Sequence, residues 1–179
     1  AVGDGRSDEI VVLRNLGGGS FGPAEAWPVP TRVGYVLGAD VDGDGDTDVL
    51  VQGFQSEPIQ WLVNDGSGGF SQIRQIVTGV PGGLGLVEDV TDDGRLDLVL
   101  RDVDGSRLFV LAGDGRGSFE PPVASAAGYR PRRMDAADFD GDGRTDLVTG
   151  TIEQPWSARV HRRSEDRRVG KECATGCRA

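Results

Sequence analysis

The chain has 179 residues, enough for one core-forming domain that buries roughly two-thirds of its surface on folding. A hydrophobic fraction of 37%, with 29 glycines and 9 prolines, favours short strands joined by tight turns over long helices. The net charge of −10 argues against nucleic acid or an anionic membrane as a partner, because both require a basic face. No apolar run approaches the ~18 residues of a membrane-spanning helix.

Four short strands are predicted in the central part of the chain. Residues 35–39 lead into an acidic loop, and residues 48–53 leave it with a run of apolar side chains. Residues 59–63 end at Asn64-Asp65-Gly66, which is a strong turn signal, and residues 70–77 complete the unit.

The same scheme returns further along. Leu98-Val99-Leu100 follows a second acidic loop, residues 108–111 run into the turn Gly113-Asp114-Gly115, and residues 159–162 occupy a third-strand position. Four antiparallel strands in a unit of 40 to 50 residues are typical of a β-propeller blade. The sequence therefore predicts an all-β fold, a partial β-propeller of about 3.5 four-stranded antiparallel blades in an open arc.

Two independent sets of residues share a period of 49 positions. Acidic nine-residue loops and Gly-x-Phe patterns both keep this register, which favours a fold built from repeats over chance similarity. The loops begin at Asp40, Asp89 and Asp138, and the phenylalanines are Phe21, Phe70 and Phe119.

Each acidic loop carries the side chains expected of a hard-cation site. Calcium takes six to eight oxygen ligands, and the loops offer side-chain oxygens at positions 1, 3, 5 and 9, with glycine at position 6 for the sharp turn. Position 7 would contribute its backbone carbonyl, because an arginine side chain there cannot be a ligand. The predicted metal ligands, for up to three Ca²⁺ sites, are Asp40, Asp42, Asp44, Asp46, Asp48, Asp89, Thr91, Asp93, Arg95, Asp97, Asp138, Asp140, Asp142, Arg144 and Asp146.

Other interpretations of the loops are weaker. The helix–loop–helix calcium site needs a glutamate at position 12, where this chain has Val51, Leu100 or Thr149. Magnesium rarely uses an all-protein cage. Solvated Asp-Gly turns remain the alternative. We expect the 40–48 loop to bind best and the 89–97 loop, with its threonine at position 3, to bind least.

The loop pattern Asp-x-Asp-Gly-Asp-Gly-x-x-Asp, the apolar triplet after it and the Gly-x-Phe landmark resemble FG-GAP/VCBS-type repeats. This resemblance covers residues 1 to about 162 and implies a β-propeller with calcium on one rim, as in integrin α subunits and many secreted bacterial proteins. The Phe-Gly pair survives only at Phe21-Gly22, and a Gly-Ala-Pro triplet is absent. No ligand specificity follows from the match.

Both ends of the chain depart from the repeat. Residues 4–8 match positions 5 to 9 of a further loop, so we expect a truncated N-terminus, and the absence of a signal peptide says nothing about export. The last 17 residues hold Cys173, Cys177 and the only lysine, Lys171, and resemble a translated sequencing adapter. We expect a truncated blade at 1–30, blades at 31–79 and 80–128, a partial blade at 129–162, and a non-native, disordered tail at 163–179.

Three functions fit these observations. The first is a non-catalytic, calcium-stabilised scaffold of a secreted or cell-surface protein, presenting its loops to a protein or glycan. The second is the propeller part of a carbohydrate-active enzyme such as a polysaccharide lyase, although His161 is the only histidine and no nucleophile motif is present. The third is a lectin that stacks sugars on Trp27, Trp61 or Trp156.

Overall fold

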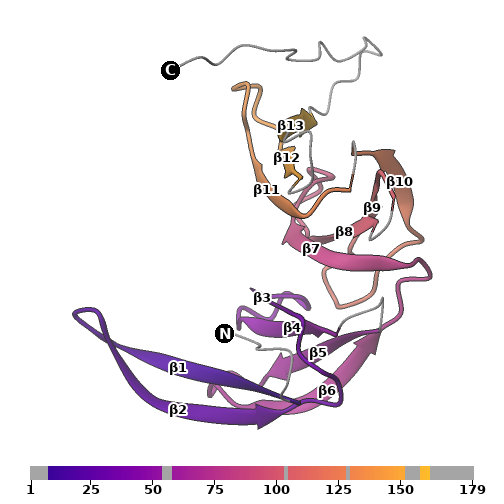
Figure 1. The fold of residues 1–179 in the computed structure, drawn as a ribbon. Helices are drawn as coiled ribbons and strands as arrows, with labels where there is room; N and C mark the ends of the chain where they lie inside the picture. The colour runs from indigo at the N-terminus through magenta and orange to yellow at the C-terminus, as the bar shows by residue number, and fades with distance from the viewer. Residues whose placement is uncertain (1–7, 54–57, 103–104, 128–129, 152–157, 162–179) are drawn as a thin grey trace.

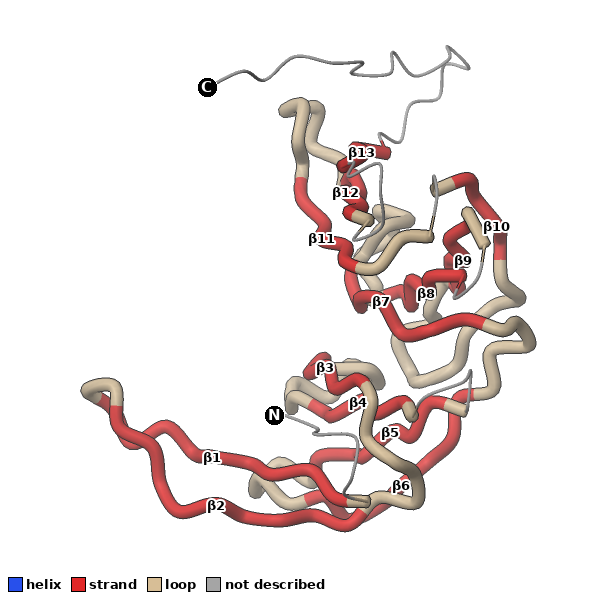
Figure 2. Tube along the Cα trace, viewed as in Figure 1, coloured by secondary structure: helices blue, strands red, loops and turns tan. Residues whose placement is uncertain are grey.

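The computed structural model describes residues 8–53, 58–102, 105–127, 130–151 and 158–161. Within these ranges the regular structure consists of thirteen strands in four antiparallel sheets (Figure 2). The described part of the chain contains no helix, and therefore none long and apolar enough to cross a membrane. Residues 1–7, 152–157 and 162–179, which include the start of the predicted fourth loop and the adapter-like tail, lie outside these ranges.

Sheets 1 and 2 form the N-terminal half. Sheet 1 has two strands and sheet 2 has four, each strand pairing with the next along the chain. Their strands are β1 (Glu9–Gly17), β2 (Ser20–Pro28), β3 (Tyr35–Ala39), β4 (Asp48–Gln52), β5 (Ile59–Asn64) and β6 (Phe70–Ile76).

Sheets 3 and 4 form the C-terminal half. Sheet 3 has four strands and the described part of sheet 4 has three, again paired in chain order. Their strands are β7 (Gly82–Glu88), β8 (Asp97–Asp102), β9 (Arg107–Leu111), β10 (Val123–Ala126), β11 (Arg133–Ala137), β12 (Asp146–Gly150) and β13 (Ala158–His161).

The hairpin of sheet 1 repeats the outer hairpin of sheet 2 residue for residue. Leu13 pairs with Ala24 in β1–β2, and Leu62 pairs with Ile73 in β5–β6, both residues being shifted by the 49-position period. Register in a sheet decides which face each side chain takes, so equal register means equal faces. Strands β1 and β2 therefore occupy the third and fourth strand positions of a blade.

The four sheets follow one another along an open arc (Figure 1). The first strands of sheets 2, 3 and 4 are neighbours in turn, since β3 contacts β7 and β7 contacts β11. Sheet 1 and sheet 4 lie at the two ends of the arc. This arrangement confirms the predicted fold class: the chain forms part of a β-propeller whose blades have not closed into a ring.

Three apolar clusters hold the sheets together, one at each junction. The face of a sheet directed toward the preceding sheet is called its upstream face, and the face directed toward the following sheet its downstream face. Leu62 lies on the upstream face of sheet 2 with Ile10 of sheet 1, whereas Trp61 lies on its downstream face with Leu84 of sheet 3. The junction of sheets 3 and 4 is built around Leu108 and Leu147 in the same way. Burial on both faces explains why the middle of each second strand is continuously apolar, at Val49-Leu50-Val51 in β4 and Leu98-Val99-Leu100 in β8.

A buried amide joins sheets 2 and 3 by hydrogen bonds. The side chain of Gln52, at the end of β4, donates from Nε2 to the Gly82 carbonyl at 3.0 Å and accepts the Leu84 N–H on Oε1. Its side chain thus bonds to the backbone of β7, a strand of the next sheet. Buried polar groups are stable only when their hydrogen bonds are made, so this contact specifies how the two sheets align.

Candidate metal-binding loops

The first residue of each acidic loop organises the backbone around itself. In the 40–48 loop, Asp40 accepts the N–H groups of Gly43 at 2.9 Å and Asp44 at 3.1 Å on Oδ1, and that of Gly45 at 3.0 Å on Oδ2. The positive φ angles of Gly43 and Gly45, +74° and +93°, curl the chain around this carboxylate. A nine-residue loop is thereby closed on a single side chain.

The other two loops close in the same way. Asp89 accepts the Gly94 N–H at 2.8 Å, and Asp138 accepts those of Gly141 at 2.6 Å and Gly143 at 2.9 Å. These N–H donors hold the pKa of Asp138 below its ordinary value, because they stabilise the ionised form. The position 1 carboxylates are therefore fixed in place by backbone N–H groups of their own loops.

The last residue of the first loop connects the loop to the outer hairpin of its own sheet. Asp48 is fully buried at the start of β4. It accepts the Val41 N–H at 3.2 Å on Oδ2 and the Asn64 N–H at 2.8 Å on Oδ1. Both of its oxygens are thus engaged by backbone groups, one within the loop and one at the end of β5.

The same connection recurs in the second loop and in part in the third. Asp97, also fully buried, accepts the N–H groups of Val90 at 3.0 Å and Gly113 at 2.9 Å. Asp146 accepts the Phe139 N–H at 3.2 Å. The sequence assigns position 9 to the metal alone and misses the role of the Asn64 and Gly113 N–H groups. The contact could have been suspected from sequence, because Asn64 follows Asp48 and Gly113 follows Asp97 by the same 16 residues.

Positions 5 and 7 are linked within each loop. The side chain at position 5 accepts the N–H of the residue at position 7, at 2.9 Å in all three loops. The N–H at position 7 is therefore bonded to the position 5 carboxylate, and the carbonyl at position 7 is the group predicted to bind the metal. The pairs are Asp44 with Asp46, Asp93 with Arg95, and Asp142 with Arg144.

Position 3 carries an oxygen without a partner in two loops. Asp42 Oδ1 and Thr91 Oγ1 are both buried from solvent and make no hydrogen bond in the structure. Buried oxygens almost always have a donor or a cation, so each of these needs one. They occupy the same place in loops that differ in sequence.

Carboxylates converge in the first and third loops. Oxygens of Asp40, Asp42 and Asp44 lie within 4.8 Å of one another, and so do oxygens of Asp138, Asp140 and Asp146. Burial raises the pKa of Asp42, and the neighbouring charges of Asp44 and Asp48 raise it further. A cation would relieve both causes. The donor set, all hard oxygen, fits calcium by its chemistry.

The sequence of these loops and strands matches a known repeat family. The sequence profile of the FG-GAP-like repeat matches residues 40–87 and 89–149, more than half of the chain. The chain belongs to the FG-GAP-like repeat family. No curated protein matches it.

A solved structure shares the fold of these FG-GAP-like repeats. It is described as a Tc holotoxin pore of Photorhabdus luminescens, with a TM-score of 0.55 and 20% sequence identity. The alignment covers 86% of this chain and 8% of that one, so this chain spans a small part of its length. At this identity the similarity concerns the fold alone.

The FG-GAP-like loops lie against neighbouring blades. A side chain at Gly43 would place its Cβ 2.9 Å from the Gly115 carbonyl oxygen, which belongs to a turn of sheet 3. In the next repeat, the Thr145 N–H approaches Asp92 Oδ1 at 3.4 Å. The first and second loops thus border the next repeat, and anything that orders either loop also orders a blade junction.

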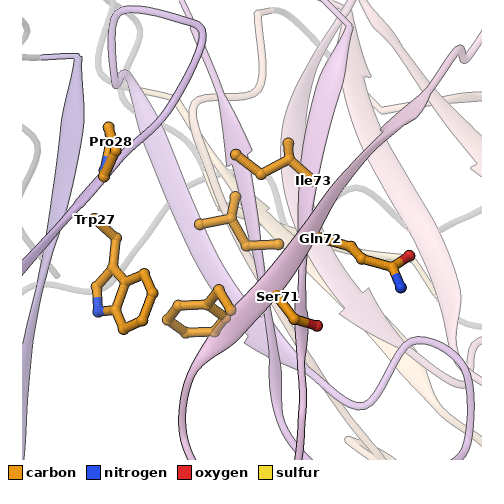
Figure 3. A pocket seen from close by; sticks show the side chains of 7 residues that line it. Trp27, Pro28, Ser71, Gln72 and Ile73 are labelled. Carbon is orange, nitrogen blue, oxygen red and sulfur yellow. The ribbon is translucent and has the colours of Figure 1, made fainter.

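The two tryptophans that the structure describes pack against other residues of the fold. Trp61 is buried and covers Gly117 of sheet 3, while Trp27 meets Phe70 edge-on, with ring centroids 5.2 Å apart. Trp156 lies outside the described residues. Trp27 also lines an apolar hollow of about 220 Å³ between β2 and β6 (Figure 3), whose walls are Trp27, Pro28, Leu62, Phe70, Ser71, Gln72 and Ile73.

Proposed function

We propose that this protein is a calcium-binding β-propeller scaffold, non-catalytic by itself, that presents its loops to a protein or glycan partner outside the cell. One observation carries the calcium part: the buried oxygens of Asp42 and Thr91, at the same loop position, have no hydrogen-bond partner. Membership of the FG-GAP-like repeat family supports it.

The side chains at positions 1, 3 and 5 would hold the ion, together with the carbonyl at position 7. In the first loop these are Asp40, Asp42, Asp44 and Asp46, and in the third loop Asp146 at position 9 joins the cluster. A bound cation supplies positive charge to carboxylates that otherwise repel one another. Because Gly43 borders sheet 3, a loop ordered in this way stiffens the junction between blades.

The location outside the cell is proposed on thermodynamic grounds. Loops with exposed carboxylates are weak sites, and weak sites fill only where calcium is near millimolar. With a dissociation constant of ~0.1 mM and ~1 mM calcium, one site contributes about 1.4 kcal/mol to folding stability. The partner would meet the loops of the propeller rim, because loops on a rigid scaffold are the usual place for recognition.

Calcium binding is tested by thermal unfolding with calcium, with magnesium at the same concentration, and with a chelator. Asp42→Asn keeps the size of the side chain but removes a charge, and should lose most of the calcium response. Asp135→Asn is the matched control, since Asp135 is exposed and outside the loops. A melting temperature indifferent to calcium in the unmodified protein would reject the proposal.

Partner binding is tested separately, with the calcium-loaded protein on a glycan array and against extracellular surface proteins. We expect binding that is saturable and weakened by the chelator. Turnover of polyuronate substrates in the same preparation would instead support a carbohydrate-active enzyme. Saturable binding that persists unchanged in Asp42→Asn would separate the partner site from the calcium loops.

A further inference from the structure

Arg101 is a buried charge beside the first strands of the sheets. These strands, β3, β7 and β11, follow one another along the concave side of the arc (Figure 1). Arg101 lies near the end of β8, pairs with Gly83 of β7, and is 3% exposed. It takes the place of Gln52 of the preceding repeat, 49 positions earlier, which is 1% exposed. The two positions are equally buried, but one holds a neutral amide and the other a positive charge.

The guanidinium of Arg101 is held by two uncharged neighbours. Its Cζ lies 4.7 Å from the centroid of the Tyr35 ring in β3, and Nη2 donates a hydrogen bond to the Tyr35 hydroxyl. A Cβ at Gly83 would lie 2.9 Å from Nη2 and 3.0 Å from Cζ. The guanidinium therefore fills the space that a side chain on β7 would need, and the glycine lets it reach Tyr35 of sheet 2.

Two nitrogens at this place lack an acceptor. Nη1 of Arg101 and Nε of Arg132 are buried from solvent and make no hydrogen bond with any described residue. None of the ion pairs in the described ranges involves Arg101, whereas the amide of Gln52 makes two hydrogen bonds to β7. A buried charge is stable only when hydrogen bonds or an opposite charge compensate it. Nη1 of Arg101 therefore needs an acceptor that carries negative charge.

Two further arginines bring positive charge to the same place. Arg132 precedes β11 and Arg133 begins it, and β11 is the neighbour of β7. The two strands approach closely, because a Cβ added at Gly85 would collide with Met134 Sδ. Burial lowers the pKa of Arg101, and the charges of Arg132 and Arg133 act in the same direction. Since Arg132 is half-buried and Arg133 is exposed, this group of charges reaches solvent on the side of sheet 4.

We propose that Arg101 and Arg132 together bind one oxyanion group, a carboxylate or a phosphate-type anion, at the junction of sheets 3 and 4. The anion accepts hydrogen bonds from Nη1 of Arg101 and Nε of Arg132, the two donors that have no other partner. Arginine N–H groups form a planar fork that fits the oxygens of both anion types. Arg133 adds positive charge where the anion enters.

The oxyanion site and the acidic loops lie at opposite ends of the strands. Strand β7 runs from Gly82 to Glu88 and leads directly into the loop that begins at Asp89, whereas Arg101 pairs with Gly83 at its start. The length of a strand therefore separates the loop carboxylates from the anion, which limits their repulsion. The inference rests neither on calcium nor on the proposed partner.

Anion binding is tested with the full-length chain in calcium-free buffer without a chelator, because carboxylate chelators are themselves oxyanions. Sodium sulfate, phosphate, acetate or chloride is added in the low millimolar range at constant ionic strength, where sulfate has little general stabilising effect. We expect a saturable rise in melting temperature of about 2–4 °C with an oxyanion and none with chloride. A larger rise with sulfate and phosphate identifies a phosphate-type ligand, and a larger rise with acetate identifies a carboxylate.

Three substitutions connect the response to these arginines. Arg101→Gln introduces the residue found in the preceding repeat and should abolish the response. Arg132→Gln changes a half-buried side chain and should weaken oxyanion affinity about tenfold or more, the loss expected for one charge-assisted hydrogen bond. Arg116→Gln is the matched control, because Arg116 is exposed in a turn of sheet 3 and its loss changes the net charge equally. It should respond like the unmodified protein.

A second measurement does not depend on stability. In protein labelled with isotope-enriched arginine, the Nε–Hε NMR signals of Arg101 and Arg132 should shift along one saturation curve as the oxyanion is added, while that of Arg116 stays unchanged. The variants assign these signals, and Arg132→Gln keeps the test valid if Arg101→Gln does not fold. An equal response to chloride, an undiminished response in Arg132→Gln, or oxyanions that change neither signal nor melting temperature would overturn the proposal.

Discussion

The loops at 40–48 and 89–97 have the same backbone framework but different ligand sets. In both, the position 1 aspartate collects backbone N–H groups, and the position 9 aspartate is fully buried between the loop and the outer hairpin. At position 3 the first loop has Asp42 where the second has Thr91. At position 4, the first has Gly43 at φ +74° and the second has Asp92 at φ +54°.

This difference separates two roles that the sequence motif alone does not distinguish. The aspartates at positions 1 and 9 hold the loop in shape in both cases, because they accept hydrogen bonds from backbone N–H groups. This role does not require a bound ion. Position 3 has no such partner in either loop. We therefore expect substitutions at position 9 to affect folding, and substitutions at position 3 to affect the response to calcium.

The largest expected effect comes from removing the shared framework. Asp48→Ala or Asp97→Ala leaves two or more buried N–H groups unpaired, and each should destabilise the fold by about 3–4 kcal/mol. Urea unfolding measures the loss, with Asp135→Ala as an exposed control. Similar losses at both sites would confirm a common framework. A cost under about 1 kcal/mol at either site would show that the N–H groups find other partners.

The next effect concerns position 4 and position 6 of the first loop. Gly43→Ala forces a side chain into positive φ and toward the Gly115 carbonyl oxygen, 2.9 Å from the new Cβ, and should cost about 2–3 kcal/mol. Gly45→Ala has a similar φ but no atom within 4 Å, so about 1 kcal/mol is expected. Equal costs in urea unfolding would mean that the contact between blades adds nothing.

Exchanging the side chains at position 3 should move the calcium response from one loop to the other. Asp42→Thr makes the first loop like the second, and Thr91→Asp does the reverse. Each change should alter the calcium-dependent part of the stability by about 1 kcal/mol, downward for the first and upward for the second. Melting curves with calcium and with a chelator give this difference directly. An unchanged response in both variants would place the ion elsewhere.

The smallest expected effect is a pH dependence in the turns beside the loops. Asp65 accepts the Ser67 hydroxyl together with the N–H groups of Ser67 and Gly69, and these bonds hold the pKa of Asp65 below its ordinary value. Its ionised form therefore stabilises the fold above about pH 4, and the contribution is lost as pH falls further.

The variant Asp65→Asn isolates this contribution. The stability difference between the unmodified protein and the variant should be constant above about pH 5 and shrink below about pH 4. Asp114 in the equivalent turn accepts the backbone N–H groups of Arg116 and Ser118, and an arginine replaces the hydroxyl-bearing Ser67 there, so Asp114 should show the same trend more weakly. A difference that grows with falling pH would contradict the assignment.

Much of the fold could be predicted from sequence because local signals and the period agree. The strand predicted at 35–39 is β3, and those at 48–53, 59–63 and 70–77 differ from β4, β5 and β6 by one residue at their C-terminal ends. Asp and Gly in fixed register also identify the loops. These features depend on neighbours in sequence, which is where a single sequence is most informative.

The tasks of individual aspartates could not be predicted in the same way. Asp48 and Asp44 look alike in sequence, yet Asp48 begins a buried strand and bonds Asn64 across the sheet, whereas Asp44 is exposed. Only the pairing of β4 with β5 brings Asn64 to Asp48.

The amide of Gln52 has a consequence for how the propeller responds to force. Its two hydrogen bonds reach Gly82 and Leu84 on the same strand of the adjacent sheet, so displacement of one sheet along the other breaks both at once. Apolar contacts alone resist separation but permit sliding, because they have little directional preference. A single glutamine therefore resists sliding of sheet 2 along sheet 3. When the chain is pulled from its ends, we expect these two sheets to unfold in one step.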